Sequence, residues 1–199
     1  MAVALLFLGA CGPSNDGQTL DGAVATPPLV VADQQLPQAG TGRPFTFRAE
    51  PGHLLAAYFG YTQCPDLCPT TMADLKVALG ELTPADAARV SVVLVTVDPE
   101  RDTPEILDAY LGSFFDADHR VALRTTDPAA LTRTEEAFLA DSAITDTANG
   151  VEVEHTATTS VVDDQGRVLV QWPFGTSAAS MAHDLRILLA RGEAAAASG

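Results

Sequence analysis

Two cysteines with three residues between them are the side chains of this chain best suited to chemistry. Cys64 and Cys68 lie in the stretch YFGYTQCPDLCPTTM, and a proline follows each of them directly. The stretch is typical of a strand-to-helix junction, where helix amides lower the pKa of a thiol and so favour the thiolate that attacks or binds a metal. The pair is therefore a redox couple, a metal site or a structural disulfide. A disulfide closing so short a loop constrains little of the unfolded chain, which weakens the third interpretation.

The remaining cysteine and the histidines limit the kind of metal site. Of the 3 cysteines, Cys11 is expected to carry a lipid, so no further thiol is left to complete a zinc set. Thiolates favour Cu(I), and one added imidazole gives that ion a three-coordinate site. Among the 4 histidines, His53 and His119 lie in ordinary loop contexts and His183 in a helix. His155 directly precedes a strand at the sheet edge, but position alone does not rank it above the others.

The hydrophobic pattern from about residue 44 onward predicts the scaffold that positions these residues. Strands are expected at 45–49, 52–61, 89–99 and 119–125, helices at 70–82, 101–115, 127–140 and 177–191, and a hairpin at 156–172. Residues 141–155 are expected to form a polar loop. Thr103 and Asp127 are expected helix caps, because a proline follows each at the first helical position. This alternation predicts an α/β sheet with helices on both faces.

The N-terminus has the pattern of a bacterial lipoprotein signal. The apolar run Ala2–Leu8 is followed by two small residues and then by Cys11, the residue expected to be acylated. This predicts an extracytoplasmic protein anchored to the cell membrane by an N-terminal lipid. Residues 12–42, rich in Gly, Pro, Asp and Gln, are expected to be a flexible linker. The folded domain is then expected at 43–191, followed by a frayed tail at 192–199.

Composition excludes one class of partner. The chain has 199 residues, 47% of them hydrophobic, which is enough for one globular domain. Its formal charge is −15, and a field of this sign repels nucleic acid, whose binding requires Lys and Arg to neutralise phosphates. No nucleic-acid partner is therefore expected. The acidity by itself indicates no function.

Three separated motifs, in order, resemble the Sco/SenC family of copper-binding assembly factors for cytochrome c oxidase. They are YFGYTQCPDLCPTTM, VTVDPERDTPEIL and VEHTATTSVVDDQGRV. The resemblance covers most of the chain from about residue 44 to 191, and it implies a thioredoxin-like fold with a central mixed sheet. It also implies a copper ion, Cu(I) and/or Cu(II), bound by Cys64, Cys68 and His155. Asp98 matches an acidic position near the family's site, which implies a role beside the metal or in docking.

The resemblance further implies a metallochaperone, rather than an enzyme, that delivers copper to the dinuclear copper centre of cytochrome c oxidase subunit II. Oxidation of Cys64 and Cys68 to a disulfide is expected to release the ion. Another copper chaperone or a thiol-disulfide reductase is a further expected partner. The alternative is a thiol-disulfide oxidoreductase that keeps the subunit's cysteines reduced, although such proteins usually have the shorter CxxC spacing. Gln63 stands where histidine is frequent in the family, which leaves the ligand set intact.

Overall fold

The computed structural model describes residues 18–147 and 150–197. The strands are β1 (Gln35–Pro37), β2 (Pro44–Thr46), β3 (Leu54–Gly60), β4 (Val90–Thr96), β5 (Arg120–Leu123), β6 (Ser142–Thr147), β7 (Gly150–His155), β8 (Thr158–Val162) and β9 (Val168–Pro173). The helices are α1 (Leu67–Gly80), α2 (Pro84–Ala87), α3 (Pro104–Gly112), α4 (Pro128–Phe138) and α5 (Ala178–Ala197), with a short 3₁₀ turn η1 (Ala117–His119).

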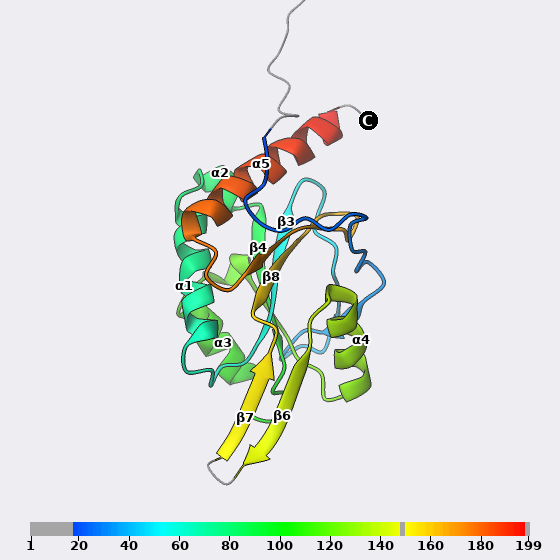
Figure 1. Cartoon of the computed structure of the whole chain (residues 1–199), viewed down its shortest axis with the longest axis vertical. Helices are drawn as coiled ribbons and strands as arrows, with labels where there is room; N and C mark the ends of the chain where they lie inside the picture. Colours follow the sequence, from blue (N-terminus) through cyan, green and yellow to red (C-terminus); the bar gives the residue numbers. More distant parts are fainter. Residues whose placement is uncertain (1–17, 148–149, 198–199) are drawn as a thin grey trace, which may run out of the picture.

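A five-stranded sheet in the order β5-β4-β3-β8-β9 forms the centre of the domain. β3 pairs in parallel with β4 and antiparallel with β8, so the sheet is mixed. In Figure 1, α1 and α3 lie on one side of the sheet and α4 on the other, while α5 packs against α1. The predicted α/β fold, with a central mixed sheet flanked by helices on both faces, is confirmed.

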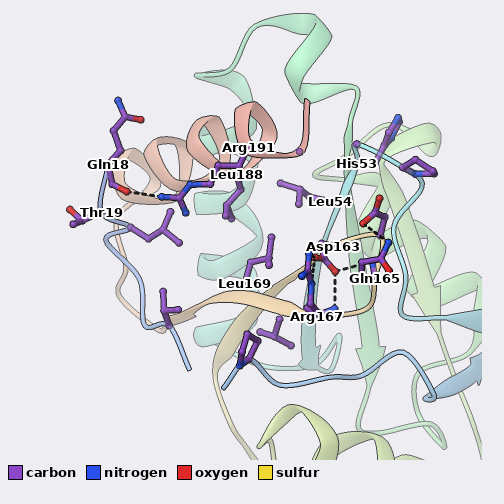
Figure 2. Close-up of a pocket in the computed structure, with 18 residues that line it drawn as sticks. Gln18, Thr19, His53, Leu54, Asp163, Gln165, Arg167, Leu169, Leu188 and Arg191 are labelled. Carbon is purple, nitrogen blue, oxygen red and sulfur yellow. Dashed lines mark hydrogen bonds and ion pairs between the residues drawn. The ribbon is translucent and has the colours of Figure 1, made fainter. Parts of the chain in front are cut away.

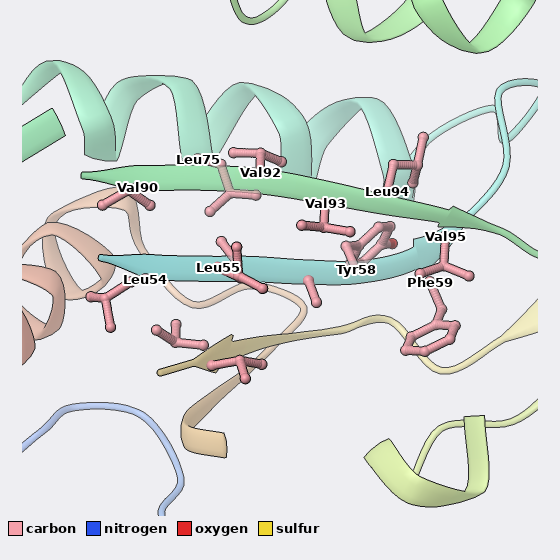
Figure 3. Packing of buried hydrophobic residues seen from close by; sticks show 14 of the residues in the cluster. Leu54, Leu55, Tyr58, Phe59, Leu75, Val90, Val92, Val93, Leu94 and Val95 are labelled. Atoms are coloured by element: carbon pink, nitrogen blue, oxygen red, sulfur yellow. The ribbon is translucent and has the colours of Figure 1, made fainter. Parts of the chain in front are cut away.

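The buried centre of this sheet is β3, whose 7 residues are all buried. Successive side chains of a strand point to opposite faces, so neighbouring residues of β3 meet different helices. The Phe59 ring packs edge-on against Phe138 of α4, with centroids 5.3 Å apart, whereas the Tyr58 hydroxyl reaches Cys68 of α1. Valines of β4 pack beside them (Figure 3). The alternation thus directs one face of β3 toward the cysteine-bearing helix.

The two predicted helix caps are present. The Thr103 hydroxyl accepts the N–H of Ile106 at 3.4 Å, and the Asp127 carboxylate accepts the N–H of Ala129 at 3.0 Å. A proline stands at the start of each helix, as expected. These local signals fix where α3 and α4 begin.

The segment before the domain packs on it, which corrects the expected flexible linker at 12–42 for the part that the structure describes. Val31 and Leu36 are fully buried, at 0% and 1% exposure. β1 pairs with β2, and an isolated bridge joins Val30 to Arg167 of the hairpin turn. The linker-like composition is misleading here because a few apolar residues among many polar ones are enough to attach a segment to a core. The domain therefore begins well before residue 43.

Two further segments differ from the expectation. Within residues 141–155, expected as a polar loop, Ser142–Thr147 and Gly150–His155 pair as the antiparallel strands β6 and β7. Their apolar residues alternate with polar ones, a strand pattern that the polar composition obscured. Helix α5 continues to Ala197 where a frayed tail was expected from 192, because an alanine-rich run has high helix propensity.

Cys11 and the expected lipoprotein signal lie outside the described residues. Within residues 18–147 and 150–197, none of the helices combines the length and the apolar character needed to cross a membrane. Acylation of Cys11 stays a prediction.

Candidate metal centre

The start of α1 brings the two cysteines together. Cys68 lies in the first turn of the helix, and its backbone N–H points to the Cys64 Sγ at 3.4 Å. The residue at the capping position, Asp66, makes no side-chain capping hydrogen bond. The Cys64 sulfur therefore occupies the place of a helix cap, because one of the free amide groups of the first turn points at it.

The third donor comes from a distant part of the chain. His155 is the last residue of β7, and its Nε2 lies 3.5 Å from the Cys68 Sγ. Its Nδ1 lies 3.4 Å from the carbonyl oxygen of Thr156, which can only accept, so we assign the ring proton to Nδ1. This leaves the Nε2 lone pair directed at the thiols. The ligand atoms of Cys64, Cys68 and His155 all lie within 4.8 Å of one another.

Burial sets the protonation of these groups. Cys68 is fully buried, and burial raises its pKa to about 12, the opposite of the lowering expected from a helix N-terminus. Burial also lowers the pKa of His155, which keeps the imidazole neutral. In the metal-free protein Cys68 is therefore a neutral thiol beside a neutral imidazole. A metal ion that binds here displaces the thiol proton.

Aromatic side chains enclose the donors. The Tyr58 hydroxyl donates to the Cys68 Sγ at 3.8 Å, and burial of Tyr58 raises the pKa of its phenol, so the hydroxyl stays protonated. The rings of Tyr58 and Tyr61 each lie 5.8 Å from the His155 ring, nearly perpendicular to it. A Cβ added at Gly60 would lie 2.6 Å from the Tyr58 ring and 3.0 Å from the Cys68 Sγ. Only glycine therefore fits at this point without displacing its neighbours.

Asp98 does not reach the cysteines directly. Its carboxylate is 2% exposed and forms an ion pair with the Nε of Arg101. The Arg101 guanidinium lies 6.0 Å from the centroid of the Tyr61 ring, which in turn contacts His155. The structure thus connects Asp98 to the donor cluster through Arg101 and Tyr61.

Asp102 is a residue that the sequence interpretation missed. It is fully buried, and its carboxylate accepts hydrogen bonds from the hydroxyls of Thr62 and Thr96, each at 2.5 Å, and from the Thr62 backbone N–H. Because β3 and β4 are parallel, the loops that follow them meet at one edge of the sheet. Asp102 joins these loops and so holds the segment that leads into Cys64. The signal that could have identified Asp102 from the sequence was its place in the motif VTVDPERDTPEIL.

The other histidines lie away from this cluster. His119 approaches the carbonyl oxygen of Val90 at 3.3 Å. His183 lies beside Asp21 and Asp184, a second group of possible ligands. The Asp184 carboxylate there accepts backbone N–H groups of the N-terminal segment and the Trp172 indole N–H at 2.9 Å. That carboxylate is best explained as an anchor for the N-terminal segment.

A groove of about 870 Å³ opens at the opposite end of β3 (Figure 2). Leu54, Leu169 and Leu188 line it together with Arg167 and Arg191. β3 spans 7 residues between this groove and the cysteine loop, about 20 Å at the usual rise per residue. The groove contains none of the three donor residues and contributes nothing to their chemistry.

The donor set fits a soft ion. Two sulfurs and one imidazole nitrogen suit three-coordinate Cu(I), while tetrahedral zinc needs a fourth ligand. Among the described residues, no further His, Cys, Asp or Glu belongs to this group of ligand atoms. The nearby carboxylate of Asp98 is already paired with Arg101.

The comparisons with known proteins all indicate the same family. A family model described as SCO1/SenC matches residues 31–190. The mitochondrial protein SCO2 of Saccharomyces cerevisiae is 37% identical over 76 residues, which cover 38% of this chain and 25% of that protein. The aligned regions amount to between 25% and 41% of the length of the curated relatives matched first.

Solved structures match over more of the chain. Bradyrhizobium japonicum ScoI with copper bound has a TM-score of 0.64 and 30% identity, and the match covers 77% of this chain and 95% of that one. The apo Sco1 protein from Thermus thermophilus has a TM-score of 0.68 and 30% identity, with 90% and 98% covered. These matches confirm the fold that the three sequence motifs predicted.

Proposed function

The chain belongs to the SCO1/SenC family, whose model spans residues 31–190, and from this premise we propose that it is a copper metallochaperone for cytochrome c oxidase. The observation that carries the proposal is the convergence of Cys64, Cys68 and His155, with ligand atoms within 4.8 Å of one another. The 30% identical ScoI with copper bound supports copper as the ion. Two buried thiols beside one neutral imidazole suit this soft cation.

Each residue of the centre has a defined part in loading. Cys68 gives up its proton, His155 offers its Nε2 lone pair, and the second sulfur comes from Cys64, the more exposed of the two cysteines. The Tyr58 hydroxyl then donates to a thiolate instead of a thiol, which strengthens that hydrogen bond. Asp98 acts through Arg101 by holding the Tyr61 ring against His155.

Release is coupled to thiol oxidation. A disulfide of a redox partner accepts two electrons from the Cys64 and Cys68 thiolates, which become a disulfide, while the partner's two sulfurs take up two protons from solvent and leave as thiols. The protein then retains His155 alone of its three donors, so the ion passes to the acceptor. A thiol-disulfide reductase or another copper chaperone completes the cycle by restoring the thiols or supplying the metal.

The acceptor in this proposal is the dinuclear copper centre of oxidase subunit II. Acylation of Cys11 would hold the domain at the extracytoplasmic side of the membrane. A shared membrane raises the effective concentration of donor and acceptor without any new contact. The domain and its acceptor can then exchange copper even if the complex is weak.

Metal transfer tests the proposal. Purified copper-loaded protein and a redox partner that carries a disulfide are mixed with the metal-free soluble domain of subunit II from the same organism, and the visible absorption of the dinuclear centre is followed. Wild-type protein is expected to build the centre, whereas the Cys64→Ser, Cys68→Ser double variant is not. A wild-type protein that binds copper but leaves the acceptor empty would refute the delivery step.

A thiol-disulfide oxidoreductase is the second candidate. Both cysteines are free in the structure, and their sulfurs lie within 4.8 Å of each other, so a modest movement brings them to disulfide distance. Insulin reduction separates the two functions, because a reductase works without His155. His155→Ala is expected to abolish copper transfer, and if the variant still matures the acceptor through its thiols alone, the oxidoreductase function is the correct one.

A further inference from the structure

A second group of possible metal ligands links the N-terminal segment to the last helix. Asp21 belongs to that segment, and His183 and Asp184 belong to α5. Figure 1 shows the segment, in dark blue at the start of the described chain, crossing α5. The ligand atoms of the three residues all lie within 4.8 Å of one another, and none of the three belongs to the group of thiols and imidazole described above.

Backbone contacts of the N-terminal segment hold Asp21 against α5. The N–H groups of Asp21 and Gly22 donate to the two oxygens of the Asp184 carboxylate, at 2.7 and 3.0 Å. Ala23 exchanges two backbone hydrogen bonds with Gln171 of β9, at 2.9 and 2.8 Å. Gly22 packs so closely on β9 that a Cβ added there would lie 2.5 Å from a side chain of that strand. The group is therefore preorganised, which lowers the entropy cost of binding a ligand there.

The distances between the ligand atoms suit a small ion. The His183 Nδ1 lies 3.2 Å from the Asp184 Oδ1 and 3.8 Å from the Asp21 Oδ2. Two ligand atoms of tetrahedral zinc lie about 3.3 Å apart when each is roughly 2.0 Å from the ion. The Asp21 side chain is half exposed, so a small rotation is enough to bring its carboxylate to that distance.

The Asp184 carboxylate can bind an ion and keep its structural contacts. It is fully buried, and its Oδ2 also accepts the Trp172 indole N–H at 2.9 Å. Its Oδ1 faces the Asp21 N–H and the His183 Nδ1, which donates to it when that nitrogen carries the ring proton. When an ion is bound between Nδ1 and Oδ1, the ring proton is carried by Nε2 instead. The ion then replaces this one hydrogen bond and leaves the others in place.

The donor atoms select a class of ion different from the one that suits the thiols. One imidazole nitrogen and two carboxylate oxygens suit borderline divalent cations such as Zn²⁺ and Cu²⁺, whereas the soft Cu(I) favours thiolates. The two carboxylates also balance the charge of a divalent ion. The formal charge of −15 on the whole chain attracts cations of either kind.

We propose that Asp21, His183 and Asp184 form a second metal site, which binds one borderline divalent cation, Zn²⁺ or Cu²⁺, and ties the N-terminal segment to α5. Such an ion crosslinks two parts of the chain that are 163 residues apart in sequence. The inference does not depend on the proposed function, because the site shares no residue with the copper donors.

Metal titration tests the site in a parent protein that carries Cys64→Ser and Cys68→Ser, so that these thiols cannot bind the added ion. Asp21→Asn and His183→Gln each remove one ligand from this parent and leave the buried carboxylate unchanged. His53→Gln is the matched control, because His53 directly precedes β3 and lies outside this group of ligands. Circular dichroism verifies that each variant folds.

Isothermal titration with zinc chloride, and separately with copper(II) chloride, measures stoichiometry and affinity. The parent protein and the control are expected to bind one ion, and each ligand variant is expected to bind it at least about tenfold more weakly. Electron paramagnetic resonance of the copper(II) form should show a coordinated imidazole nitrogen that is lost in His183→Gln. The two titrations together identify which of the two ions the site prefers.

Limited proteolysis reports whether the ion ties the segment to α5. Zinc is expected to slow cleavage within residues 18–34 of the parent protein and to have no such effect in Asp21→Asn. A parent protein that binds neither ion would overturn the proposal. Equal affinity in Asp21→Asn, His183→Gln and the control would overturn it as well, and the cluster would then be an ion pair only.

Discussion

Tyr58 contacts two of the three proposed donors of the candidate metal centre. Its hydroxyl donates to the Cys68 sulfur at 3.8 Å, and its ring lies edge-on to His155. The hydrogen bond is weak with a thiol and stronger with the thiolate that metal binding creates. Tyr58 therefore favours the loaded state over the empty one.

Replacing Tyr58 with Phe should weaken copper binding while leaving the ring packing intact. Loss of one hydrogen bond of roughly 1 kcal/mol corresponds to about fivefold in affinity. Competition with a Cu(I) chelator measures this change. Tyr110→Phe is the matched control, because the Tyr110 hydroxyl is buried without a hydrogen-bond partner among the described residues. Equal copper affinity in the two variants would contradict this role of Tyr58.

At the residue scale, the sequence predicts the donors better than their environment. Spacing and cysteine count identify Cys64 and Cys68 as a chemical pair, but only the family resemblance distinguishes His155 from the other histidines. A lowered thiol pKa was predicted at the helix N-terminus, but the pKa of Cys68 is raised, because burial outweighs the effect of the helix amides. Burial and the contacts of Asp102 depend on how distant loops meet, which no local pattern encodes.

At the element scale, α4 and the hairpin are joined by a buried carboxylate. Glu135 is 4% exposed and accepts a hydrogen bond from the Ser142 hydroxyl at 2.5 Å. Ser142 pairs with His155 across the base of the hairpin. Burial raises the pKa of Glu135 despite the opposing effect of this hydrogen bond.

The raised pKa predicts how stability depends on pH. The folded state binds the Glu135 proton more tightly than the unfolded state does. The favourable effect of this proton on the free energy of unfolding is therefore fully present below the unfolded pKa of roughly 4.3, and it is lost as pH rises through the folded pKa. Glu135→Gln should therefore match the wild type at about pH 4 and exceed its free energy of unfolding at about pH 7.

Urea denaturation at both pH values measures the difference. Glu136→Gln serves as the control, because its exposed side chain is the neighbour of Glu135 on the same helix. A Glu135→Gln variant that is less stable than the wild type at the higher pH would contradict this account. In that case the charged hydrogen bond to Ser142 would outweigh the cost of burial.

The elements themselves were largely predictable from periodicity. The valine-rich β4, the capped helices α3 and α4, and the final β8–β9 hairpin lie where the pattern and the cap residues indicate. The β6–β7 hairpin was missed, because its two strands are polar on one face and lie outside the main sheet. A strand with few buried side chains has a polar composition similar to that of a loop.

At the scale of the whole molecule, the two ends of the sheet differ in character. The loops after the parallel strands β3 and β4 gather the cysteines, Asp98 and Asp102 at one end. The other end carries the groove, which the N-terminal segment helps to line. Such an edge at the carboxyl ends of parallel strands is where α/β proteins usually place their sites.

The domain boundary is where the sequence was least informative. Residues 18–42 have the composition of a linker, yet Val31 and Leu36 are buried and the Asp184 carboxylate binds the backbone of Asp21 and Gly22. Attachment of this kind depends on partners more than a hundred residues away in the chain. Local composition cannot reveal it.

We propose that Cys64, Cys68 and His155 together bind one copper ion. X-ray absorption at the copper edge of the reduced, copper-loaded protein tests it most directly, because sulfur and nitrogen neighbours scatter differently. We expect two sulfur neighbours and one imidazole nitrogen, with the imidazole signal lost in His155→Ala. A shell of nitrogen and oxygen only, or a spectrum unchanged in the Cys64→Ser, Cys68→Ser double variant, would contradict it.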